Sequence, residues 1–63
     1  MKPSLTQLAR NRQKLVTALC GVRQESMRAT DSRDYRAVGK LTLEAARINS
    51  AIAEVDVAEL FAL

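Results

Sequence analysis

The chain has 63 residues and a formal net charge of +3, with 48% hydrophobic and 27% charged residues. A chain of this length forms one small domain and buries only about 60% of the surface that its unfolded form exposes. The sequence has no histidine and a single cysteine, Cys20, so it offers neither a cluster of metal ligands nor an internal disulfide. We therefore expect a partner to complete the fold.

The composition favours helices over strands. Aromatic residues make up only 3% of the chain, which contains one proline and two glycines. Strands are typically enriched in aromatic and β-branched residues, which are scarce here. The predicted fold class is therefore all-α, in the form of an antiparallel two-helix hairpin that resembles a coiled coil.

The first predicted helix covers about residues 5–28. Ser4 and Gln7 have the spacing of a capping box, in which each side chain bonds to the backbone N–H of the other residue. Arg12 interrupts an otherwise apolar stripe, and two interpretations are open. Either its stem packs while its head reaches solvent or a carboxylate, or its charge faces a partner. The apolar residues assigned to the seam with the second helix are Leu5, Leu8, Leu15, Leu19 and Val22.

A short link, about residues 29–32, separates the two predicted helices. Asp31 or Ser32 can cap the second helix, and Asp34 is also placed favourably in its first turn. Two long helices joined by so short a link pack antiparallel.

The second predicted helix, about residues 33–61, carries two apolar stripes. Each stripe steps by three and four residues, as helical seams do. The first consists of Val38, Leu41, Ala45, Ile48, Ile52 and Val55. The second consists of Leu43, Ala46, Ser50, Ala53, Val57 and Leu60. The two sets are offset by two positions, which is roughly 200° around the helix, so they point to opposite sides.

A helix that is apolar on both sides must be covered on both sides. The first helix can cover only one stripe, so the other requires a second molecule. We assign Leu41, Ile48, Ile52 and Val55 to the intramolecular seam, although one sequence does not settle which stripe is internal. The residues assigned to a protein interface are Tyr35, Val38, Leu43, Ala46, Ala53, Val57, Leu60 and Phe61.

The charge is divided unevenly along the chain. Residues 1–40 carry nine basic and three acidic residues, a net charge of +6, whereas residues 41–63 carry one basic and four acidic residues, a net charge of −3. In a hairpin, the acidic end of the second helix lies beside basic residues of the first and neutralises part of this charge. The basic residues left at the loop end are Arg23, Arg28, Arg33, Arg36 and Lys40.

No constellation of residues indicates an enzyme. A two-helix rod has no cleft, and nothing pairs Cys20 or a serine with an activating base. We expect no cofactor, no metal and no catalytic residues. Nor does any apolar run approach the length of a membrane span, and the N-terminal residues lack the apolar run of a signal peptide, so we expect a cytoplasmic protein.

Two binding hypotheses are open. In one, two copies form a four-helix bundle that contacts nucleic acid through the basic loop-end residues. In the other, the hairpin docks its second stripe into a groove of a different protein. The first predicts strong salt dependence, and the second predicts a chain that behaves poorly on its own.

The stretch from Arg12 to Val38 resembles a known family. Arg12-Gln13-Lys14-Leu15, Ala18-Leu19, Arg23, Glu25, Arg28 and the aromatic Tyr35 are similar to the central part of the helical-hairpin co-chaperones of type III secretion systems. These are the E-type partners of the needle-subunit chaperone. Beyond Val38 the similarity continues if the second helix here has about three extra residues before Ala46.

The resemblance implies a cytoplasmic protein that pairs with a helical-repeat chaperone. Such a pair keeps the needle subunit unpolymerised before export. In this interpretation Tyr35 and Val38 begin the contact surface, and Leu43, Val57 and Leu60, or the facing stripe, complete it.

Overall fold

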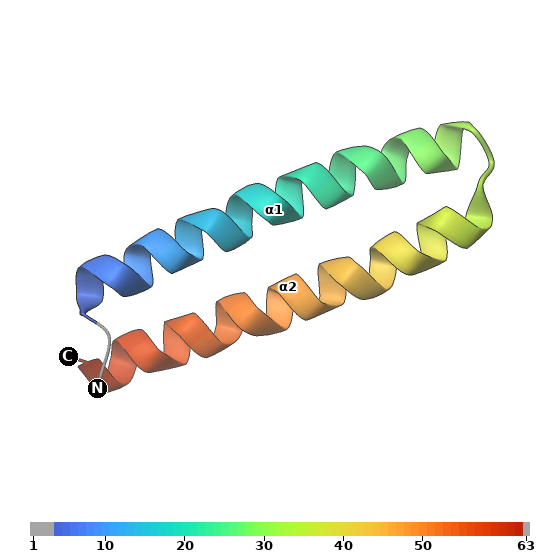
Figure 1. Ribbon diagram of the computed structural model, residues 1–63. Coiled ribbons are helices and arrows are strands. Elements are labelled where there is room, and N and C mark those ends of the chain that lie inside the picture. The colour runs from blue at the N-terminus through green and yellow to red at the C-terminus, as the bar shows by residue number, and fades with distance from the viewer. Residues whose placement is uncertain (1–3, 63) are drawn as a thin grey trace.

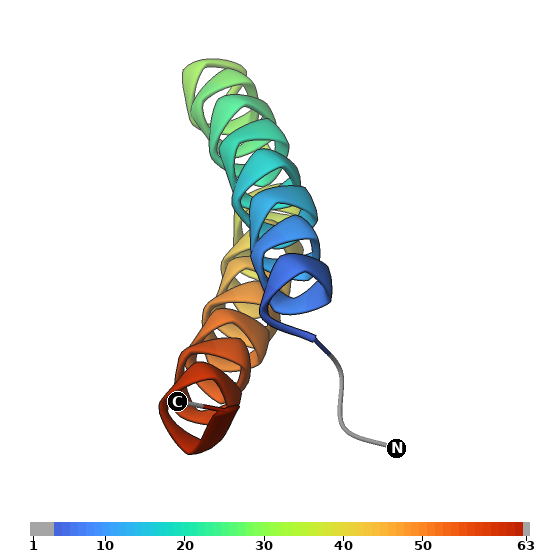
Figure 2. The same ribbon diagram turned by 90° about the vertical axis from the view of Figure 1, so that its left-hand side faces the viewer.

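The computed structural model describes residues 4–62 and consists of two antiparallel α-helices, α1 (Leu5–Asp31) and α2 (Tyr35–Ala62), as Figure 1 shows. The hairpin is a rod of 45 × 15 × 14 Å. Seen from the end opposite the turn, the helices cross each other rather than running strictly parallel (Figure 2). The predicted all-α helical hairpin is therefore confirmed.

α1 begins with the predicted capping box. The Gln7 backbone N–H donates to Ser4 Oγ at 3.1 Å, and the Ser4 backbone N–H donates to Gln7 Oε1 at 3.3 Å. Each bond satisfies a backbone donor near the start of the helix, where no intrahelical acceptor is available.

α1 ends at Asp31, three residues later than the sequence predicts. Two backbone bonds close the end of the helix: Arg33 N–H donates to the Thr30 carbonyl at 3.0 Å, and Asp34 N–H donates to the Ala29 carbonyl at 2.8 Å. This pair of bonds defines a Schellman motif, which needs a left-handed residue that is usually glycine. Arg33 takes that conformation, with φ of 59°. Because the link contains no glycine, its sequence does not mark the end of the helix.

α2 begins at Tyr35 rather than near residue 33. Its cap is Asp34, because Asp34 Oδ1 accepts the Ala37 backbone N–H at 3.2 Å. The Asp34 carbonyl also accepts the Val38 N–H at 3.1 Å. The prediction that Asp31 or Ser32 caps this helix is therefore wrong, because Asp31 still belongs to α1 and Ser32 and Arg33 form the turn.

The buried core is small. Among the described residues, only Leu8, Leu19 and Val22 are buried, with 4%, 7% and 8% of their surface exposed. All three belong to α1, and no residue of α2 reaches this degree of burial. α2 covers one side of α1, but a two-helix rod has no third element to enclose α2.

Candidate interaction surface

The two stripes of α2 have different environments. Every residue of the first stripe, from Val38 to Val55, is half-buried, whereas every residue of the second is exposed. The first stripe therefore packs against α1 and the second faces away from it. From here on, the outer stripe is the set Leu43, Ala46, Ser50, Ala53, Val57 and Leu60.

Most residues assigned to the intramolecular seam lie between the helices. Leu8, Leu19 and Val22 are buried, and Leu15 is half-buried, as are Leu41, Ile48, Ile52 and Val55 of α2. Leu5 differs, because 49% of its surface is exposed at the open end of the hairpin. Leu5 is less buried than the other seam residues because only the last turn of α2 lies opposite it.

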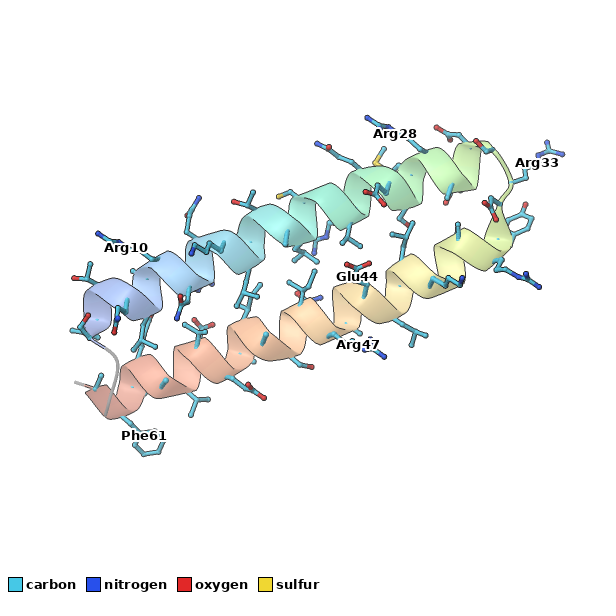
Figure 3. All side chains as sticks on the ribbon, in the orientation of Figure 1. Arg10, Arg28, Arg33, Glu44, Arg47 and Phe61 are labelled. Atoms are coloured by element: carbon cyan, nitrogen blue, oxygen red, sulfur yellow. The ribbon has the colours of Figure 1, made fainter. Side chains whose placement is uncertain are left out.

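The residues assigned to the interface are exposed with one exception. Tyr35 is 70% exposed and Phe61 81% exposed, and Figure 3 shows Phe61 projecting from α2 on the side away from α1. Val38 is instead half-buried. It lies one turn before Leu41 on the inner stripe, so the structure places it in the seam and not on the outer surface.

The outer stripe carries large apolar side chains at both ends and small ones in the middle. Leu43 is 64% exposed, Val57 50% and Leu60 70%. Ala46, Ser50 and Ala53 lie between Leu43 and Val57. An exposed apolar row of this length on a small protein is typical of a protein interface.

A shallow hollow of about 350 Å³ lies over the first half of the outer stripe. It is lined by the small residues Ala46, Ser50 and Ala51 together with Leu43, Arg47 and Glu54. An apolar side chain of another helix could enter this hollow between two charged groups of opposite sign.

A second open groove of about 460 Å³ lies along one side of the seam. Leu8, Leu15 and Val55 contribute apolar surface to it, and Lys14 and Glu54 contribute charged groups. Glu54 borders both this groove and the hollow on the outer stripe. The two depressions therefore adjoin along α2.

The accessible surface of the hairpin is larger than that of a typical globular protein of the same mass. Its accessible surface is 5191 Å², about 1,200 Å² more than the roughly 4,000 Å² typical of a monomeric globular protein of 6.9 kDa. A standard protein interface covers about 800 Å² on each partner. The excess is therefore large enough for one such interface.

The five basic residues assigned to nucleic acid in the alternative hypothesis are all exposed: Arg23, Arg28, Arg33, Arg36 and Lys40. Figure 3 shows Arg28 projecting from α1 away from α2 and Arg33 projecting outward at the turn. Three acidic residues, Glu25, Asp31 and Asp34, are interspersed among them, so residues 23–40 have a net charge of only +2. This end of the rod is weakly basic rather than strongly so.

Some features of the surface escaped the sequence analysis. Met27, on α1, is 69% exposed although it belongs to neither predicted face. The hollow beside Arg47 and Glu54 was also missed. Their spacing of seven residues, which places both on one flank of the outer stripe, was the available signal.

Other kinds of site receive no support within residues 4–62. No group of three or more potential metal-ligating residues comes together in this part of the chain. Neither α1 nor α2 is long and apolar enough to cross a membrane.

Comparisons with protein-family models, with curated proteins and with solved structures find no match to the chain. The resemblance to the secretion co-chaperones therefore stays a prediction from the sequence.

Proposed function

We propose that this hairpin is an interaction protein whose outer stripe is covered by helices of another protein. The observation that carries the proposal is the full exposure of this stripe while the opposite stripe of the same helix packs against α1. Only three of the described residues are buried in the hairpin alone, so covering the outer stripe adds apolar burial that the hairpin lacks.

The partner class that we propose is a helical-repeat chaperone. Helical repeats stack into extended concave surfaces, and such a surface can receive one side of a rod about 15 Å thick. The resemblance of residues 12–38 to the type III secretion co-chaperones supports the same class. In that role the hairpin stabilises the chaperone, and the pair holds the needle subunit unpolymerised.

The test is affinity capture of the tagged chain from cells of its source organism, followed by reconstitution from purified components. The wild-type chain is expected to form a stoichiometric complex with a helical-repeat protein. Leu60→Glu should abolish the complex, because it places a charge in apolar surface that the partner covers.

Met27→Glu is the matched control. Met27 and Leu60 are equally exposed, at 69% and 70%, but Met27 lies on α1. This variant should bind the partner as the wild type does. A complex that survives Leu60→Glu unchanged, or is lost equally in both variants, would show that the outer stripe is not the binding surface.

A further inference from the structure

We infer that the outer stripe also pairs with the outer stripe of a second copy, with the two α2 helices antiparallel. The arrangement puts both α2 helices in the centre and one α1 on each outer side. It goes beyond the proposed function, because it requires no other protein. Three features of α2 support it: the order of its side chains, the position of the hollow and the distribution of charge.

The order of side chains in the outer stripe is symmetric about a point between Ala51 and Ile52. In an antiparallel pair centred there, Leu43 lies level with Leu60 of the second copy. By the same register Ala46 lies level with Val57, and Ser50 with Ala53. Large residues meet at both ends and small ones in the middle, where the helices can approach closely. The stripe is thus self-complementary, as a two-fold interface requires.

The hollow lies where this register requires a receiving site. In knobs-into-holes packing, a side chain enters a hole formed by four residues of the facing helix. Leu43, Ala46, Arg47 and Ser50 have the spacing of such a hole, and all four line the hollow. Ala46, one of these four residues, is level with Val57 of the second copy, whose side chain is 50% exposed.

Charges favour the antiparallel direction. Residues 35–47 of α2 carry three basic residues and one acidic residue, whereas residues 48–62 carry three acidic residues and no basic one. In this register Arg36 and Lys40 are level with positions past residue 62 of the second copy, so the favourable charge contact comes from Arg47, which is level with Asp56. A parallel pair instead places Arg47 level with Arg47.

Arg47 and Glu54 make this complementarity specific. A two-fold axis normal to the plane of the two helices places the same flank of each helix on the same side of the interface. Arg47 of one copy therefore lies on the same side as Glu54 of the other, about 3 Å from its level along the axis, twice in each dimer. In a parallel pair Glu54 faces Asn49 instead, and these attractive pairs are absent.

The same stripe serves the second copy and the partner of the proposed function, so the two interactions exclude each other. The dimer is the form in which the free chain covers its own apolar surface. The test of the dimer therefore uses the purified chain alone. If the chain does not dimerise, the proposed binding of another protein is not affected by that result.

The experiment is a charge exchange followed by light scattering across a dilution series, under reducing conditions. The wild-type chain should be a dimer with twice the monomer mass of 6.9 kDa. Arg47→Glu and Glu54→Arg each turn two attractive pairs into two repulsive ones, so each should weaken dimerisation about tenfold. An equal mixture of the two variants should restore wild-type affinity, because both pairs in the mixed dimer are attractive again.

Arg10→Glu is the matched control, because Arg10 projects from α1 away from α2 (Figure 3). It makes the same change in net charge as Arg47→Glu and should leave the dimer unchanged. A monomeric wild-type chain at every concentration would overturn the inference. So would a mixture that binds no better than its components, since only the antiparallel register predicts rescue.

Cysteine crosslinking gives a second measurement that does not depend on charge. With Cys20→Ser as background, Ala46→Cys and Val57→Cys are mixed and oxidised. The two thiols are level in the proposed register and should form a disulfide-linked mixed dimer. Two Ala46→Cys chains place their thiols about 16 Å apart along the axis, beyond disulfide reach. Equal crosslinking of the mixture and of Ala46→Cys alone would contradict the register.

Discussion

Arg12 of α1 and Asp56 of α2 form an ion pair across the hairpin, with Arg12 Nε donating to Asp56 Oδ1 at 2.9 Å. Arg12 occupies an inward position of α1, one turn after the buried Leu8. Of the two interpretations open from the sequence, the structure shows the one in which the arginine head reaches a carboxylate. Because the pairing joins residues 44 apart, it also marks the register in which the two helices pack.

The Arg12–Asp56 pair should contribute little stability. The two side chains are 46% and 49% exposed, and ion pairs with this much solvent contact are typically worth 0.2 to 1 kcal/mol. A double-mutant cycle with Arg12→Ala and Asp56→Ala, followed by urea unfolding, should give about 0.5 kcal/mol of coupling that decreases with added salt. A coupling above about 2 kcal/mol, unaffected by salt, would contradict the exposed environment.

Leu19 and Leu60 should respond very differently to truncation in the dilute chain. Leu19 is 7% exposed and Leu60 70% exposed. Leu19→Ala should lower the free energy of unfolding by about 2–5 kcal/mol, enough to unfold a hairpin with so small a core. Leu60→Ala should change it by less than about 0.5 kcal/mol. Circular dichroism at low concentration distinguishes the two, and equal losses of helicity would mean that the outer stripe is part of the internal core.

Arg33 is in a conformation that glycine adopts more easily. Its φ of 59° lies in the left-handed region, where a side chain costs about 1 kcal/mol. Arg33→Gly should therefore raise the free energy of unfolding by about 0.5–1 kcal/mol, as measured by thermal melting. Arg33→Ala removes the charge but keeps a Cβ, so it should bring no such gain. Equal stabilisation by both substitutions would indicate a charge effect instead.

Asp34 should be the important cap of α2. Its carboxylate accepts the Ala37 backbone N–H at 3.2 Å, so Asp34→Ala leaves that donor without its side-chain acceptor. The expected loss is about 1 kcal/mol of stability. Asp34→Asn keeps an oxygen acceptor and should lose much less. Asp31→Ala and Ser32→Ala provide the comparison with the caps predicted from sequence, and a larger effect at either position would contradict the observed start of α2.

The helices and the inner seam could be predicted from the sequence because both depend on local or periodic signals. The Ser4–Gln7 capping box is a short-range pattern, and the stripe from Leu41 to Val55 follows helical spacing over several turns. The exposed outer stripe follows from the same periodicity once α1 is known to cover the other side.

The position of the turn could not be predicted, because the left-handed residue that forms it is arginine rather than the glycine that usually marks such a turn. A glycine at position 33 would have marked the end of α1, but arginine takes the left-handed conformation there instead. Val38 was assigned to the interface through the family resemblance, although its spacing from Leu41 places it in the seam. The hollow beside Ala46 depends on the combined shape of neighbouring side chains, which periodicity alone does not describe.

The central claim is that the outer stripe is the surface through which the free chain pairs with a second copy, and thermal unfolding across a wide range of protein concentrations tests it most directly. Self-association through this stripe makes the melting temperature of the wild-type chain rise with concentration. The melting temperature of Leu60→Glu should be independent of concentration, whereas Met27→Glu should behave as the wild type does. A fully helical wild-type chain that melts at one temperature throughout, and at the same temperature as Leu60→Glu, would contradict the claim.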